Sequence, residues 1–283
     1  MSELYRQVLA SLHLGFLQYD FMKNALLAII FVSPLFALLG TMVVSNRMAF
    51  FSDVLGHSAL TGIALGVIFG IADPLRALVI FTVMLALAIN YFKGVTGASS
   101  DTTLGVFFAM VVALGVVILS KNGGFNKYTT YLIGDILTIS GGQVKLVATA
   151  FFLVIGYWFL FGNNLLLLSV NPSLARSRGV KISLIEMSFV AVLAIIVAIS
   201  IRLVGILIIN SLLILPAATA RLIARNTAKY TFYSVLISLL CGVSGLIASY
   251  YWNTASGATI VLLCAFAYVI TALITGWLRK KVA

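Results

Sequence analysis

The sequence predicts an all-α, polytopic integral membrane protein with about eight or nine transmembrane helices. Of its 283 residues, 62% are hydrophobic and only 9% are charged, whereas soluble domains carry about 25% charged residues. Apolar runs long enough to span a bilayer recur along the chain. Lys and Arg, which give a net charge of +11, lie in the short breaks between these runs, as in cytoplasmic loops. We therefore attribute the charge to membrane orientation and not to nucleic-acid binding.

The expected helices follow from the apolar runs in chain order. The first covers 24–45, where Pro34 predicts a kink. The others are 54–71, 77–92, 104–120, 146–162, 184–201, 203–218, 232–251 and 258–278. The stretch 131–140, YLIGDILTIS, is amphiphilic and is expected to enter the membrane only partway.

Residues 184–218 are too long for one upright helix and tight for two full crossings. As one helix they would extend about 52 Å, against about 30 Å of hydrocarbon per crossing. Arg202 and Gly205 lie in the middle. A helix that ends near Arg202 and a short returning helix are therefore expected, because broken segments are tolerated where protein or a water-filled path surrounds them.

Basic residues predict the orientation. Clusters of Lys and Arg occur at 163–183, at 219–231 and at the C-terminal RKK, with two expected crossings between each cluster and the next. All three then face the cytoplasm. Counting back through nine crossings places the N-terminus outside, where Lys121, Lys127 and Lys145 would also lie, against the same rule.

Missing motifs exclude several classes of function. There is no G-x-x-x-x-G-K-[ST], so the chain has no P-loop, and there is no H-E-x-x-H of zinc proteases. Cys and His do not cluster with structural-zinc spacing, and Cys241 and Cys264 lie in apolar runs as packing residues. A polytopic chain with so few charges is typical of a transporter and not of an enzyme.

Residues 52–66, SDVLGHSALTGIALG, place an acid and an imidazole in an apolar segment. Asp53 and His57 are four residues apart and therefore share one helical face. Ionisable groups at membrane depth are costly and usually functional, and mixed oxygen and nitrogen ligands suit Zn²⁺ or Mn²⁺. The alternative is structural: Asp53 would cap the helix, and His57 would be a core histidine. A metal site would also need further ligands.

Gly62, Gly66 and Gly70 form G-x-x-x-G-x-x-x-G, which is typical of close helix packing in membranes. In an unbroken helix, this stripe points about 180–260° away from Asp53. The sequence therefore predicts a helix with a glycine face packed against a neighbour and an acid–histidine face on the other side.

Two further segments are candidates for function. Residues 204–225 contain Asn210 and Pro216, which could line a path and, in the case of Asn210, supply a ligand. The alternative is a Pro-kinked helix with a basic anchor. Residues 171–182, NPSLARSRGVKI, predict a short helix capped by Asn171 and stopped at Gly179.

Four stretches together resemble a known family. They are RMAFFSDVLGHSALTGIALG (47–66), YLIGDILTIS, LARSRGV (174–180) and VGILIINSLLILPAATARLIAR (204–225). In this order they are similar to the permease subunit of the bacterial zinc, manganese and iron ABC importers. The resemblance runs from about residue 24 to the C-terminus.

The resemblance implies one transmembrane permease domain over 1–283, with an N-terminal segment at 1–20 and a fold like that of the type II permeases for vitamin B12 and siderophores. It also implies a second copy of the chain, cytoplasmic ATPase subunits and an extracytoplasmic metal-binding protein, in the bacterial cytoplasmic membrane. Asp53 and His57 match the metal-handling residues of the family, and 171–182 matches its coupling helix. The ATPase contacts implied are Ser173, Leu174, Ala175 and Arg176, with Gly179 closing the turn.

The metal would be the cargo, with no permanently bound cofactor. Ser58, Ala59, Leu60 and Thr61 after His57 are more similar to zinc permeases than to manganese ones, so zinc is expected, with manganese or iron as alternatives. A rival reading is a self-powered secondary transporter or channel in which Asp53 binds a proton or cation.

Overall fold

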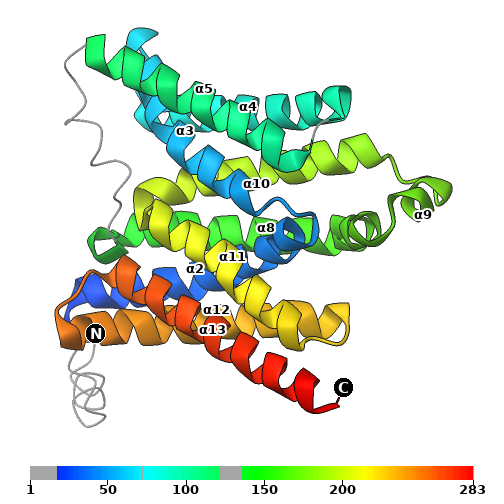
Figure 1. The fold of residues 1–283 in the computed structure, drawn as a ribbon. Helices are drawn as coiled ribbons and strands as arrows, with labels where there is room; N and C mark the ends of the chain where they lie inside the picture. Colours follow the sequence, from blue (N-terminus) through cyan, green and yellow to red (C-terminus); the bar gives the residue numbers. More distant parts are fainter. Residues whose placement is uncertain (1–17, 72, 98, 122–135, 283) are drawn as a thin grey trace.

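The computed structural model describes residues 18–71, 73–97, 99–121 and 136–282, which form helices packed side by side (Figure 1). The elements are α2 (Asp20–Ser45), α3 (Ala49–Ile68), α4 (Pro74–Thr96), α5 (Ser100–Lys121), η2 (Ile136–Thr138), α8 (Gly141–Val170), α9 (Pro172–Ser177), α10 (Ile182–Val204), α11 (Ile206–Ile223), α12 (Thr227–Trp252) and α13 (Ser256–Val282). Of the segment expected to enter the membrane partway, residues 131–135 lie outside the described residues, and η2 follows them.

Within the described residues, eight helices are long and apolar enough to cross a membrane: α2, α4, α5, α8, α10, α11, α12 and α13. The 20-residue α3 runs among them (Figure 1). The expectation of eight or nine transmembrane helices is therefore confirmed, and the chain is a multi-pass membrane protein.

One end of the bundle gathers the expected cytoplasmic segments. The short helix α9, the turn between α11 and α12, and the C-terminus all lie at this end, whereas α2 begins at the other (Figure 1). These segments contain or adjoin the three basic clusters of the sequence. We call this end of the bundle the basic end.

The predicted break in 184–218 is confirmed. Helix α10 ends at Val204, Gly205 has φ 88° and ψ 155°, and α11 begins at Ile206. A side chain at position 205 would be strained at this positive φ, so glycine suits the site. The chain reverses here (Figure 1), and α11 returns toward the basic end through the interior.

Helices α2 and α12 are joined by hydroxyl groups of α12 that bond to backbone carbonyls of α2. Ser238 Oγ donates to Ser33 O at 2.9 Å, Ser234 Oγ to Ala37 O at 3.3 Å, and the Tyr230 hydroxyl to Thr41 O at 3.3 Å. Their spacing of four residues gives one bond per helical turn. Such bonds are worth about 0.6 kcal/mol each between membrane helices, so the three together fix the register of this pair.

The predicted glycine face of α3 is present, with one correction. A methyl group at Gly62 would lie 3.1 Å from Phe81 Cβ, and one at Gly66 would overlap the Ala77 methyl, so both glycines pack tightly on α4. The prediction is wrong for Gly70, which lies beyond the end of α3 with φ 68° and no atom within 4 Å of a built Cβ. It serves the turn after the helix instead.

The contact between α2 and α11 predicts a strong effect of Gly40→Ala. A Cβ at Gly40 would overlap the backbone carbonyl of Leu213, which cannot rotate away as a side chain could. Because overpacking of this kind typically costs 1–3 kcal/mol, we expect about 3 kcal/mol loss of unfolding free energy. Denaturant titration in mixed micelles, followed by circular dichroism, measures it.

Gly156→Ala is the matched control, because Gly156 lies within α8 with open space around a built Cβ. Alanine is favoured over glycine in a helix by about 1 kcal/mol, so this variant should lose no stability. Equal midpoints for the two variants would contradict the close approach at Gly40.

Candidate metal-handling site

Asp53 of α3 and Asn210 of α11 are brought together although they are 157 residues apart. Asn210 Nδ2 donates a hydrogen bond to Asp53 Oδ1, and both residues are partly buried. The other amide atom, Asn210 Oδ1, is buried and has no hydrogen-bond partner among the described residues. The site thus presents a carboxylate and an unsatisfied amide oxygen side by side, in a place where an unpaired polar atom is costly.

His57 lies one helical turn further along α3 than Asp53. Its ring is exposed in the single chain and meets the Phe108 ring of α5 edge-on, with centroids 5.3 Å apart and planes at 88°. His57 is therefore not an enclosed core histidine, and Asp53, five residues into α3, lies beyond the capping position. The geometry therefore excludes a capping role for Asp53 and a core position for His57.

The three side chains offer oxygen and nitrogen donors but an incomplete set for a stable metal site. Among the described residues, no group of three or more His, Cys, Asp or Glu side chains could hold a metal ion. A closed tetrahedral zinc site uses four protein ligands. One carboxylate, one amide oxygen and one imidazole are instead suited to brief coordination, with the remaining positions filled from outside this set.

Neighbouring contacts hold α3 in place around the site. A Cβ at Gly56 would collide with the Ile206 side chain, so α3 lies directly against the first turn of α11. On the other side, Thr61 Oγ1 donates to Val111 O of α5 at 2.7 Å. Because Gly56 lies between Asp53 and His57 and Thr61 lies one turn beyond His57, these contacts fix the face of α3 that carries the site.

The second residue suggested for the path, Pro216, lies buried within α11. It is six residues beyond Asn210, toward the basic end. No described hydrogen bond links Pro216 to Asp53 or His57, so the structure brings Asn210 into the site and leaves Pro216 in the packing of α11.

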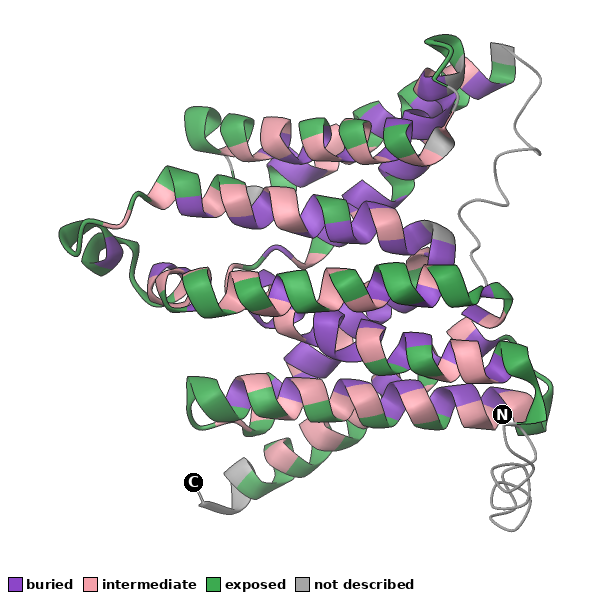
Figure 2. Ribbon diagram, turned by 180° about the vertical axis from the view of Figure 1, so that it is seen from behind, coloured by how far each residue is buried: buried purple, intermediate pink, exposed green. Residues whose placement is uncertain are grey.

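Helix α9 forms as the sequence predicts and projects at the basic end (Figures 1 and 2). Asn171 Oδ1 accepts from Leu174 N at 3.1 Å as the N-terminal cap, and Gly179 has φ 76° in the turn that follows. Four of the residues expected to contact an ATPase are exposed: Ser173, Leu174, Arg176 and Gly179. The fifth, Ala175, is fully buried within the chain, so it supports α9 and offers no surface to a partner.

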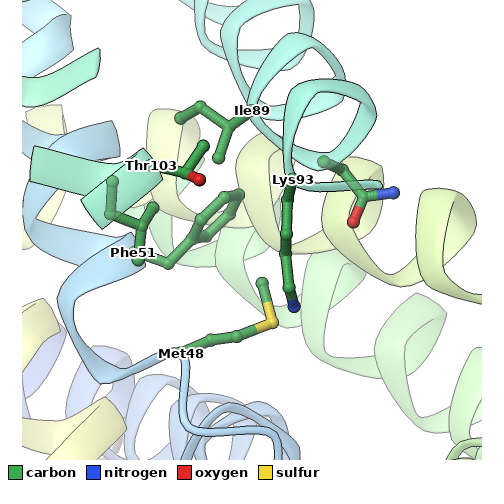
Figure 3. A pocket seen from close by; sticks show the side chains of 7 residues that line it. Met48, Phe51, Ile89, Lys93 and Thr103 are labelled. Carbon is green, nitrogen blue, oxygen red and sulfur yellow. The ribbon is translucent and has the colours of Figure 1, made fainter. Parts of the chain in front are cut away.

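A polar hollow near the basic end was not predicted. Met48 and Lys93 point toward one another in a pocket that Phe51, Ile89 and Thr103 also line (Figure 3). An adjoining cavity shares Met48, Asn90 and Lys93 with this pocket and adds two further polar groups, Asn46 and Glu186. The sequence signal for this hollow was weak, because its polar residues come from separate segments: Asn90 and Lys93 from α4, Thr103 from α5 and Glu186 from α10.

Known proteins with similar sequences include transport proteins for metal ions. Residues 18–275 match the family described as the ABC 3 transport family. The high-affinity zinc uptake system membrane protein ZnuB of Haemophilus influenzae is 36% identical over 254 residues, which cover 89% of this chain and 97% of that protein. The manganese import system permease protein ScaB of Streptococcus gordonii is 28% identical over 271 residues, covering 95% and 97%.

A solved structure has a similar fold over nearly the whole chain. PsaBC from Streptococcus pneumoniae, determined in complex with Fab, contains a chain that superposes with a TM-score of 0.81 at 26% identity. The superposition covers 96% of this chain and 99% of that one. Of the relatives described here, ZnuB is named as part of a zinc uptake system and ScaB as part of a manganese import system.

Proposed function

The chain belongs to the ABC 3 transport family and is the permease of a metal ABC importer. On this basis, we propose that Asp53, His57 and Asn210 form a transient metal site on its translocation path. The observation that carries the proposal is the bond between Asp53 and Asn210 across two helices, beside an exposed imidazole. The buried, unpartnered Asn210 Oδ1 is an oxygen donor that a passing cation would satisfy.

An incomplete site suits transport. A cation must bind well enough to leave water but weakly enough to move on. Three protein donors with open positions meet both requirements, since water or a donor from a second copy of the chain completes the coordination and is easily exchanged. The exposed ring of His57 is the open side of this site.

The cargo is proposed to be zinc, on the residues that follow His57 in the sequence, with manganese or iron as the alternatives. The relatives named for zinc and for manganese favour neither metal, and carboxylate with imidazole accepts both. The choice rests on Ser58 to Thr61 alone and is therefore left to a direct rate comparison.

Energy is proposed to come from a separate cytoplasmic ATPase that contacts the exposed residues of α9, with two copies of the chain and a metal-delivery protein on the opposite face. The sequence has no P-loop, so the chain requires a partner to use ATP. Closure of the ATPase subunits would move α9 relative to the bundle and switch the path from outward to inward access.

Reconstitution tests the function. The chain is purified with the ATPase that accompanies it and placed in liposomes, and metal uptake is measured with and without ATP. We expect ATP-dependent uptake, faster for Zn²⁺ than for Mn²⁺ at equal free concentrations. Equal or reversed rates would contradict zinc but not metal import.

The same liposomes distinguish the rival class. The chain alone, under a proton or sodium gradient and without the ATPase, should show no uptake above protein-free liposomes. Uptake driven by the gradient alone would overturn the ABC mechanism in favour of a secondary transporter.

A further inference from the structure

A groove opens beside α9, between the last turns of α8 and the first turns of α10. It consists of two adjoining cavities that share Asn164, Arg178 and Val180. Lys181 adds a second basic group and Asn163 a second amide, while Phe161 and Leu184 line the apolar part. The groove therefore combines basic and amide groups with an apolar wall in one surface feature.

The mouth of the groove is positively charged. Arg178 and Lys181 are both exposed, and no acidic residue is among the residues that line either cavity. The ion pairs found in the described chain join Lys23 with Asp20 and Arg76 with Asp73, so neither basic residue of the groove is neutralised by an ion pair there. This charge fits an anionic ligand that also accepts hydrogen bonds from amide groups.

The groove also extends into the depth of the bundle. Phe161 lies nine residues before the end of α8, and Ser188 lies six residues beyond the start of α10. At 1.5 Å per residue, these positions are about 14 Å and about 9 Å from the helix ends. At the deep end, the Tyr157 hydroxyl and Ser188 Oγ are hydrogen-bonded at 2.9 Å, so the polar groups there bond to one another and the wall is left apolar.

An apolar outer face adjoins the groove on α8. Phe159 is 83% exposed, Leu160 75% and Val170 79%, and Leu184 on α10 is 59% exposed. Exposed apolar side chains on a helix long enough to span the membrane are suited to contact with acyl chains. The groove thus has a charged mouth at the basic end and an apolar wall that continues into an exposed apolar surface.

We propose that this groove is a binding site for an anionic phospholipid of the leaflet at the basic end. Arg178 and Lys181 hold the phosphate, Asn163 and Asn164 donate to the headgroup, and Phe161 and Leu184 contact an acyl chain. Basic pockets between membrane helices on the cytoplasmic side are suited to such headgroups. A lipid fills both the charged mouth and the apolar depth, whereas a free phosphate leaves that depth empty.

Native mass spectrometry of the full chain tests the site without ATPase or metal, so its outcome is independent of the transport proposal. The delipidated chain is titrated with phosphatidylglycerol and, separately, with phosphatidylcholine. We expect phosphatidylglycerol to bind selectively, and Arg178→Gln with Lys181→Gln to weaken it about 30-fold, since each basic residue near an anionic membrane contributes about five-fold. The charge-conserving pair Arg178→Lys with Lys181→Arg should retain most of the affinity.

The matched control is Arg225→Gln with Lys229→Gln, which removes the same charge from exposed residues at the same end of the bundle, outside the groove. It should change the affinity less than two-fold. An equal loss in both double variants would show general surface attraction and overturn the site. Full competition by millimolar inorganic phosphate would identify a soluble-anion site and overturn the lipid assignment.

Discussion

Asp53→Ala is expected to lower ATP-driven metal uptake at least about 100-fold while leaving the chain folded and assembled with its ATPase. Asp53 supplies the carboxylate of the proposed site, and its Oδ1 is the acceptor for Asn210. Groups that only orient a metal ligand typically contribute 10–100-fold to metal affinity or activity, so removal of a direct ligand should reach at least the upper value. Metal uptake into proteoliposomes measures the loss, and co-purification of the ATPase measures assembly.

Asn210→Ala provides the second arm of the same prediction. Asn210 contributes one oxygen and orients Asp53, so its loss should lower uptake about 10-fold. If the two residues act as one unit, the double variant should be no worse than Asp53→Ala alone, because coupled residues are not additive. A double variant that loses the product of the two separate factors would contradict their joint role.

Asp101→Asn is the control for loss of an acid. Asp101 is exposed in the first turn of α5, away from Asp53, and its replacement should leave uptake unchanged. Normal uptake by Asp53→Ala would remove Asp53 from the metal path. Loss of uptake together with loss of ATPase co-purification would assign Asp53 a structural role instead.

The face of α3 that carries the site could be predicted from sequence because it depends only on helical periodicity. Asp53 and His57 are one turn apart, and Gly62 and Gly66 fall on the opposite side, as found in the packing against α4. The same periodicity gave a wrong prediction for Gly70, because the helix ends at Ile68. The bond from Ile71 N to Gly66 O at 2.8 Å belongs to a helix-terminating turn, in which a positive φ favours glycine.

The partner of Asp53 could not be predicted, because it depends on how α3 and α11 cross. The amide of Asn210 made it a candidate ligand, but Asn210 lies 157 residues from Asp53. No sequence pattern links the two residues. The approach of Gly56 to Ile206 brings the two helices close enough for the bond. Sequence patterns describe each helix separately, whereas this contact arises from the packing of two.

The hollow beside Met48 and Lys93 and the orientation of Ala175 were missed for related reasons. The hollow is built from polar residues of several helices that are far apart in the sequence, so no local pattern predicts it. Helix α9 has only six residues, less than two turns, and its hydrophobic pattern is too short to identify the buried side. Only the arrangement of α8 and α10 around α9 places Ala175 inside.

Leu174→Asp is expected to uncouple the permease from the ATPase that we propose as its partner. Leu174 is 43% exposed on α9. Asn171 caps the helix by accepting a hydrogen bond from Leu174 N, and the neighbouring Ala175 is buried against the bundle. An exposed leucine on a capped helix that projects from the bundle is suited to a pocket in a partner. Replacement by a charge should weaken ATPase binding about 30-fold, corresponding to about 2 kcal/mol for a central interface contact.

Two measurements separate this effect from damage to the fold. Leu174→Asp should unfold at the same denaturant concentration as the unmodified chain, because the side chain is not part of the core, yet co-purify little ATPase and import metal at least 10-fold more slowly. Ala228→Asp is the matched control, since it places the same charge on an exposed residue at the basic end, in the first turn of α12. Unchanged ATPase binding by Leu174→Asp, or an equal loss in Ala228→Asp, would remove α9 from the proposed coupling contact and direct the search for the ATPase surface to the turn between α11 and α12.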